Sequence, residues 1–167
     1  KFFGTCLARE LGIAVPKTVA LPNKDYPEGI VAESLGNLTY PVDWREIAAY
    51  TGMPAFLKPH WGGGWKLVNR VDSVDELLAR YDESGNHCMI LQEAISWSMY
   101  VRCICIGQRE ILVVPWDPRK SHFERYVGAM HWRLESTLER LIADQARMLN
   151  EALGYDMNTV EFAVRDG

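Results

Sequence analysis

The sequence lacks several patterns that would assign it to a common functional class. Its four cysteines, Cys6, Cys88, Cys103 and Cys105, include no CxxC pair and no metal-ligand spacing with the four histidines. We therefore expect reduced, mostly buried thiols and a cytoplasmic location. No apolar run is long enough to span a bilayer, so we expect no membrane partner.

Positive charge is also scarce. The 167 residues carry 18 Lys and Arg against 22 Asp and Glu, a formal net charge of -4. Because nucleic-acid binding needs broad basic surfaces, this balance argues against a nucleic-acid partner. Motifs for a serine or cysteine nucleophile and for a metalloprotease are absent as well. The composition leaves the oligomeric state open, a homodimer included.

The pattern of apolar residues predicts a mixed fold. Hydrophobic residues make up 48% of the chain, enough for one core or for two small subdomains. Helices are expected over residues 2–11 and 134–153, and capping boxes predict three helix starts, at Asp43, Ser73 and Ser136. Residues 21–41 show no sustained period and predict a long surface excursion. Strands are expected at 16–21, 53–60, 66–71, 88–95, 99–107, 110–117 and 158–167, the last ending in a turn at Asp166 and Gly167. The order predicts an α+β fold with largely antiparallel sheets.

The stretch FLKPHWGGGWKL, residues 56–67, sets Lys58 at the end of an apolar strand and three glycines between two tryptophans. It is neither a Walker A loop nor a dinucleotide fingerprint, because no Lys-Ser or Lys-Thr pair follows and the glycines are consecutive. Two interpretations remain: an ordinary hairpin turn, or a loop whose N–H groups approach an anion closely. Lys58 favours the second, since a buried ammonium needs an anionic partner. Trp61 and Trp65 either anchor the hairpin or shield bound phosphates from water.

Four segments, in this order, resemble the ATP-grasp superfamily, which includes D-alanine:D-alanine ligase and glutathione synthetase: residues 54–78, 88–95, 99–114 and 154–167. The resemblance implies two α+β subdomains that grip ATP between them. We divide them as residues 1–91 and 92–167. Since the chain begins with Lys1 rather than Met, we expect it to be part of a longer protein whose second subdomain continues past Gly167.

The resemblance assigns ATP contacts to the first half of the chain. Lys58 matches a lysine that binds the α and β phosphates, and Lys1 an earlier phosphate-binding lysine, with a solvated terminal lysine as the alternative. The phosphate-covering loop matches Gly62, Gly63 and Gly64. Backbone groups that meet adenine match Gln92, Glu93, Ala94 and Ile95. Met99 stands where many relatives carry a ribose-binding glutamate, and Glu93 is the alternative residue for that contact.

In the second half, the resemblance assigns catalytic roles to Arg102 and Arg125 alongside Lys58. Arg102 matches a phosphate or substrate ligand; the alternative is a strand arginine paired with a carboxylate. The segment with Arg119, Lys120, His122 and Arg125 is either a solvated loop or a mobile basic flap that neutralises the γ phosphate or orients the acid. Glu161 matches the first Mg²⁺ carboxylate, with an exposed strand glutamate as the alternative and the remaining ligands expected past Gly167.

The resemblance therefore implies an ATP-dependent ligase that uses ATP and Mg²⁺. A small-molecule carboxylate would attack the γ phosphate to give an acylphosphate, and an amine or amino-acid nucleophile would then displace phosphate. Two alternatives stay open: a nucleotide-binding module without ligase activity, and a phosphotransferase with the same grip on ATP. The sequence does not identify the acid or the nucleophile.

Overall fold

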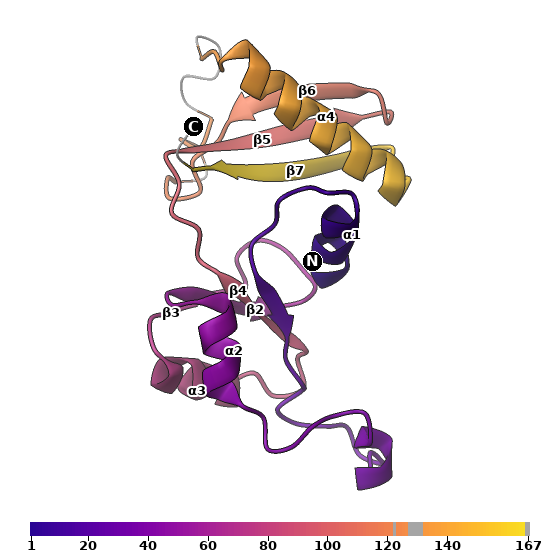
Figure 1. Cartoon of the computed structure of the whole chain (residues 1–167), viewed down its shortest axis with the longest axis vertical. Helices are drawn as coiled ribbons and strands as arrows, with labels where there is room; N and C mark the ends of the chain where they lie inside the picture. The colour runs from indigo at the N-terminus through magenta and orange to yellow at the C-terminus, as the bar shows by residue number, and fades with distance from the viewer. Residues whose placement is uncertain (122, 127–131, 166–167) are drawn as a thin grey trace. The chain divides into compact units, whose positions relative to one another are not determined.

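The computed structural model describes residues 1–121, 123–126 and 132–165, and the chain forms two compact units. Unit 1 comprises residues 1–9 and 14–94, and unit 2 comprises residues 10–13 and 95–167. Figure 1 shows the helices and strands of each unit. His122 of the predicted flap and the predicted turn at Asp166 and Gly167 lie outside the described residues.

Unit 1 is built on a four-stranded antiparallel sheet in the order β1-β4-β2-β3. The strands are β1 (Thr18–Ala20), β2 (Ala55–Pro59), β3 (Asn69–Val71) and β4 (Met89–Glu93). Alternate residues of these strands point into an apolar core that includes Leu57, Val71 and Leu91, all fully buried. Helix residues Leu77 and Tyr81 complete this core. The sheet therefore fixes β2 and β4, which carry predicted site residues, side by side.

The helices in the first part of the chain are α1 (Phe2–Glu10), α2 (Trp44–Thr51) and α3 (Val74–Asp82), with a short 3-10 turn η1 (Ala32–Leu35). The predicted starts of α2 and α3 are confirmed. The Asp43 side chain accepts a hydrogen bond from the backbone N–H of Glu46, and the Ser73 side chain accepts one from that of Glu76. Between β1 and α2, the described chain forms only η1, which confirms a long irregular segment.

Unit 2 holds a three-stranded antiparallel sheet, in the order β6-β5-β7, with one long helix packed on it. Its elements are β5 (Met99–Ile106), β6 (Glu110–Pro115), α4 (Ser136–Leu153) and β7 (Met157–Val164). Cys103 and Cys105 point from β5 into the core, where they meet Ile142 and Ala146 of α4. Burial raises the pKa of the Cys103 thiol to about 12. The predicted shared face of these two cysteines is confirmed, whereas Cys6 is exposed.

The predicted start of α4 is wrong by one residue. Glu135, not Ser136, caps the helix: its carboxylate accepts hydrogen bonds from the backbone N–H groups of Thr137 and Leu138. These amide donors lower the pKa of Glu135. A carboxylate prevails here because it satisfies two helix N–H groups at once and faces the positive end of the helix dipole. The helix ends as predicted at Gly154, which has the left-handed φ of 67°.

The observed elements confirm the α+β class and the antiparallel sheets. Among the residues that the structure describes, no helix has the combination of length and apolarity needed to cross a membrane.

Candidate functional site

Lys58 lies on β2 within a series of hydrogen bonds that crosses the sheet of unit 1. Its Nζ donates to Oε1 of Gln92 on β4 at 2.6 Å, and Nε2 of Gln92 donates to Oγ1 of Thr18 at 2.9 Å. The Thr18 hydroxyl in turn donates to the carbonyl of Pro16 at 2.9 Å. Because both ends of the Gln92 amide are engaged, its oxygen is held toward the ammonium group. Two predicted site residues therefore meet directly.

Thr18 is a member of this arrangement that sequence reasoning missed. It is buried, with 6% of its surface exposed, on the edge strand β1, whose other two residues are apolar. A buried hydroxyl requires hydrogen-bond partners, so a threonine inside a short predicted strand was the available signal. Its partner could not be inferred, because Thr18 and Gln92 are 74 residues apart in the chain.

The glycine loop, residues 60–68, connects β2 to β3, as the predicted hairpin required. Four of its residues have left-handed φ values: Gly62 (81°), Gly64 (68°), Trp65 (62°) and Leu67 (54°). Glycine adopts this conformation freely, but tryptophan and leucine do so at a cost. The strand predicted over residues 66–71 was therefore too long, since the left-handed residues interrupt the extended backbone and only β3 remains.

Open space surrounds the three glycines. A Cβ atom added to Gly62, Gly63 or Gly64 would meet no atom within 4 Å. Within the described part of the chain, no hydrogen bond uses the backbone N–H of these three residues. The loop thus presents exposed N–H groups that make no hydrogen bond within the described chain, with room for an anion to approach them. Gly63 lacks a left-handed φ, so its own backbone does not demand glycine.

Lys1 lies at the base of the glycine loop. Its Nζ donates to the carbonyls of Pro59 and Trp61 at 3.2 and 3.3 Å. Partial burial lowers the pKa of this ammonium group, since desolvation disfavours its charged form. A second cation therefore lies where β2 passes into the loop, held by neutral carbonyl groups.

The two tryptophans of the loop pack against neighbours but stay largely exposed. The Trp65 ring meets Phe56 edge-on at 6.5 Å between centroids, and the Trp61 ring lies 5.8 Å from that of His87. Trp61 and Trp65 nevertheless keep 56% and 53% of their surfaces exposed. These contacts anchor the hairpin, and the exposed faces leave the shielding interpretation open.

The segment predicted to meet adenine makes hydrogen bonds with its own unit. Glu93 donates its N–H to the carbonyl of Lys17 at 2.9 Å, and its Oε2 accepts from the Lys17 N–H at 3.1 Å. The N–H of Ala94 donates to the carbonyl of Pro54 at 3.2 Å. Unit 1 ends at Ala94, and Ile95 belongs to unit 2. The Glu93 carboxylate is therefore oriented by a backbone donor of its own sheet.

In unit 2, the register of β5 and β7 sets Arg102 opposite Glu161. Arg102 Nη2 donates to one carboxylate oxygen of Glu161, and the Tyr100 hydroxyl donates to the other at 2.9 Å. Nη1 of Arg102 donates to the Tyr126 hydroxyl at 2.7 Å. The carboxylate pairing considered for Arg102 is therefore present, and its partner is the predicted metal ligand.

Charge and burial both act on this cluster. Burial and the nearby Glu161 carboxylate raise the pKa of Tyr100 well above its usual value, so its hydroxyl remains a donor. Although burial opposes the charge of Arg102, its hydrogen bond to Glu161 raises its pKa overall. The guanidinium stacks 4.0 Å above the Trp116 ring, and its buried Nε has no hydrogen-bond partner among the described residues.

The Glu161 carboxylate has free acceptor positions for a magnesium ion. Within the described ranges, no three His, Cys, Asp or Glu side chains gather into a group that could hold a metal. Mg²⁺ bound with a nucleotide needs only one or two carboxylates, because phosphate and water oxygens complete its shell. A carboxylate has about four acceptor positions, and Glu161 uses two of them. Glu161 therefore fits as a single ligand, oriented by Tyr100 and Arg102.

The basic segment after β6 folds back on itself. Arg119 binds both carboxylate oxygens of Asp117, at 3.0 and 2.9 Å. These bonds lower the pKa of Asp117 to about 2. Arg125 donates through Nε to the carbonyl of Lys120 and stacks 5.3 Å from the Trp116 ring. Arg102 and Arg125 thus both lie over the Trp116 ring, which brings two predicted catalytic arginines to one side chain.

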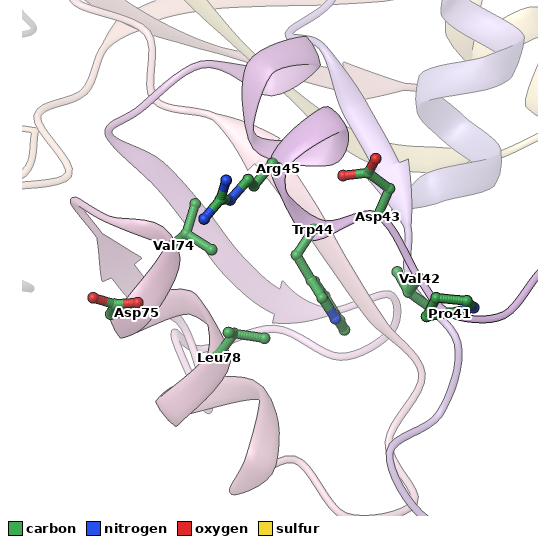
Figure 2. A pocket seen from close by; sticks show the side chains of 8 residues that line it. All are labelled: Pro41, Val42, Asp43, Trp44, Arg45, Val74, Asp75 and Leu78. Atoms are coloured by element: carbon green, nitrogen blue, oxygen red, sulfur yellow. The ribbon is translucent and has the colours of Figure 1, made fainter.

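A cavity of about 540 Å³ lies in unit 1 at the starts of α2 and α3. Figure 2 shows the Trp44 side chain between Leu78 on one side and Val42 on the other. Its lining includes none of the residues predicted for a site, and of its two carboxylates, Asp43 and Asp75, the first already caps α2. We assign this cavity no role in the site.

Comparisons with known proteins give the following findings. No protein-family model matches the chain, and no curated protein does. The chain is similar to a solved structure of the VanG D-Ala:D-Ser ligase from Enterococcus faecalis, with 22% identity and a TM-score of 0.67 over 98% of this chain and 47% of that one. It is similar to the D-alanine–D-alanine ligase from Bacillus anthracis complexed with ATP, with 17% identity and a TM-score of 0.68 over 99% and 50% of the two chains.

A third structure, the D-alanine–D-alanine ligase from Helicobacter pylori, has 18% identity and a TM-score of 0.64 over 100% of this chain and 47% of that one. The chain thus spans about half the length of the solved structures that it matches. At these identities the similarity shows the fold, and that fold is the predicted ATP-grasp fold.

Proposed function

We propose that this chain, with its ATP-grasp fold, is the nucleotide-binding part of an ATP-dependent ligase that joins a carboxylic acid to an amine or a similar nucleophile. One observation carries the proposal: Lys58, oriented by Gln92, lies on the strand that leads into a glycine loop with unused N–H donors. The reaction class is supported by the similar structures, which are ligases, one of them described with ATP.

In unit 1 the proposed role is to hold the phosphates of ATP. The Lys58 ammonium would bind the α and β phosphates, and the N–H groups of Gly62, Gly63 and Gly64 would cover them. Lys1, at the base of the same loop, adds a second cation. Gln92 and Thr18 fix the position of Lys58 before ATP arrives, so little reorganisation would accompany binding. For the adenine edge we propose the backbone of Gln92, Glu93, Ala94 and Ile95; because the N–H groups of Glu93 and Ala94 already donate within unit 1, the contact would use the other backbone groups of this segment.

In unit 2 the proposed role is to neutralise charge during phosphoryl transfer. The substrate carboxylate would attack the γ phosphate, releasing ADP and forming an acylphosphate, and the nucleophile would then displace phosphate. Arg102 and Arg125 would balance the charge on the transferring group, which is the main task of the protein in such reactions. Glu161 would hold Mg²⁺, which when bound would supply further positive charge to the phosphate oxygens.

The direct test is ATP binding and phosphate release by the full-length protein, with a panel of carboxylic acids, amino acids and peptides as substrates. Lys58→Ala should lower turnover by about 10²-fold or more, comparable to removing a preorganised donor. The matched control is Lys24→Ala, which removes a surface lysine of the same unit that pairs with Asp82. Equal turnover of the two variants would refute the role of Lys58.

Two glycine substitutions distinguish whether the loop needs glycine for close approach of the ligand or for its backbone conformation. Gly63→Ala should leave the fold unchanged, because its Cβ would lie in open space at an ordinary φ, yet it should weaken ATP binding by filling that space. Gly62→Ala should also destabilise the loop, by about 1 kcal/mol, because of its left-handed φ. Normal ATP affinity of the Gly63→Ala protein would show that phosphates do not approach this loop.

A nucleotide-binding module without ligase activity is the second candidate. It is favoured by Met99, which packs against the apolar cluster of unit 2 and offers no polar group to ribose. ATP binding without phosphate release in the presence of any acid would support it. Product analysis separates the third alternative, because a phosphotransferase yields a phosphorylated product whereas a ligase yields free phosphate.

A further inference from the structure

A cavity of about 190 Å³ lies in unit 2, where β5 begins and β6 ends. It has room for roughly six water molecules at the volume of liquid water. That volume suits a ligand of amino-acid size. Every residue that lines it belongs to unit 2.

One part of the cavity wall is apolar and aromatic. Trp97, Tyr100 and Trp116 form a continuous row, with ring centroids 5.3 Å apart for the first pair and 5.5 Å for the second. Met99 and Pro115 extend the same wall. Aromatic rings bury a large apolar area at specific geometry, so this wall favours a ligand with an apolar body.

The other part is positively charged. Arg119, Lys120 and Arg125 line the cavity together with a single carboxylate, that of Asp117. Asp117 is already bound by Arg119, so the lining has a net charge of two positive units in a chain whose formal net charge is -4. A positive cavity in an acidic protein concentrates anions.

Two guanidinium groups lie over aromatic rings of the wall. Arg119 lies 4.2 Å above the Trp97 ring, and Arg125 lies 5.3 Å from the Trp116 ring. A ring in contact with a guanidinium helps to hold it while its N–H groups remain able to donate. The two terminal nitrogens of Arg125 have no hydrogen-bond partner among the residues that the structure describes. A pair of in-plane N–H groups matches a carboxylate.

We propose that this cavity binds the acid substrate, and that it selects a small carboxylic acid with an apolar body about the size of one ring. Arg125 and Lys120 bind the carboxylate, and Trp97 and its neighbours contact the body. The assignment rests on the proposed function, because it names the acid that the ligase would activate. It differs from a site for small polar amino acids, which would leave the aromatic wall without a partner.

Binding of five probes to the full-length protein tests the proposal, by calorimetry and by tryptophan fluorescence. The probes are benzoate, cyclohexanecarboxylate, benzamide, D-alanine and inorganic phosphate. We expect both ring carboxylates to bind at least about tenfold more tightly than the other three. If benzamide bound as tightly as benzoate, the positive charge of the cavity would not contribute to binding. D-alanine or phosphate equal to benzoate would show that the apolar wall is not used, and either result overturns the proposal.

Variants locate the binding at this cavity. Lys120→Gln and Trp97→Ala should each weaken benzoate binding by about tenfold. Lys120 is exposed, so its substitution leaves folding unaffected, whereas thermal unfolding must confirm that Trp97→Ala is folded. The control is Arg147→Gln, which removes one positive charge from α4 of the same unit. Equal losses in control and test variants, or no loss in Lys120→Gln, would overturn the proposal.

ATP binding measured in the same samples separates this proposal from the proposed function. Normal ATP binding and acid-stimulated phosphate release, without any preference for ring carboxylates, would overturn only the substrate class. Absence of ATP binding would instead refute the proposed function, while benzoate binding would then still mark the cavity as an anion site.

Discussion

Unit 1 and unit 2 each contain an antiparallel sheet, yet Lys58 and Lys1 of the first have different hydrogen-bond partners from Arg102 and Arg119 of the second. In unit 1, Lys58 donates a hydrogen bond to the amide oxygen of Gln92, and Lys1 donates to two backbone carbonyls, all of them neutral acceptors. In unit 2, Arg102 and Arg119 donate to the carboxylates of Glu161 and Asp117, and Arg102 also donates to the Tyr126 hydroxyl. A neutral acceptor fixes the position of a cation, whereas a carboxylate also balances its charge.

This difference indicates distinct tasks for the two units. A cation held by neutral groups suits a polyanion such as the phosphates of ATP. An arginine held by a carboxylate is already stable without a ligand, so any ligand must compete with that carboxylate or use the remaining N–H groups. The following four changes test the comparison.

The cores differ as well as the charges, and truncating them should have the largest effect. Leu57→Ala should destabilise the protein by about 2–5 kcal/mol, because Leu57 is fully buried at the centre of the unit 1 sheet. Cys103→Ala in unit 2 removes only a sulfur atom and should cost less, about 1 kcal/mol. Urea unfolding of both variants measures the difference. A larger loss for Cys103→Ala would reverse the comparison.

Gln92→Glu gives Lys58 a carboxylate as a hydrogen-bond partner, as Arg102 has in Glu161. The new carboxylate would lie beside Lys58 Nζ, balance its charge and repel phosphate, so ATP affinity should fall by at least about tenfold. Gln108→Glu, in the turn between β5 and β6, adds the same charge to unit 2 and serves as the control. If calorimetry gives both variants the same ATP affinity, the neutral partner of Lys58 has no importance for binding.

Glu161→Gln makes the converse change in unit 2. Arg102 would lose its charged partner, and the Tyr100 hydroxyl would face a neutral amide instead of a carboxylate. The free energy of unfolding should therefore fall by about 1–2 kcal/mol. Thermal unfolding measures the loss, with Glu110→Gln on β6, the opposite edge strand of the sheet, as the control. Unchanged stability would mean that the pair contributes nothing to the fold of unit 2.

Acid titration should have the smallest effect on stability, because Asp117 and Arg119 are at the surface. The pKa of Asp117 is lowered to about 2 by its hydrogen bonds with Arg119. Its contribution is therefore present above the ordinary aspartate pKa of about 4 and is lost as the pH falls through about 2. Carboxyl carbon NMR should show Asp117 still ionised at pH 3. A titration midpoint near the ordinary aspartate pKa would show that the Asp117–Arg119 pair does not form in solution.

Local features of the fold were predictable from the sequence, and non-local ones were not. Asp43 and Ser73 cap helices through bonds to residues three positions away, so a short pattern identifies them. Cys103 and Cys105 share a face because strand residues alternate. Glu135 displaced Ser136 as a cap because adjacent capping residues compete, and spacing alone does not decide between them.

The candidate site divides in the same way. Lys58 and the glycines stand out in the sequence, although their roles stay predictions. The meeting of Arg102 with Glu161 depends on a strand register that joins residues 59 apart, and the left-handed backbone at Trp65 accompanies its contact with Phe56. Neither follows from local propensity. Sequence patterns identified candidate residues, but only the paired strands show which ones touch.

The empty surroundings of Gly63 also make it a natural position for a reporter. A cysteine introduced there would have an ordinary φ and no neighbour within 4 Å of its Cβ, so an attached fluorophore would extend into solvent without disturbing the fold. Arrival of a nucleotide would change the polarity around the dye. The loop could thereby signal occupancy in real time, independently of turnover.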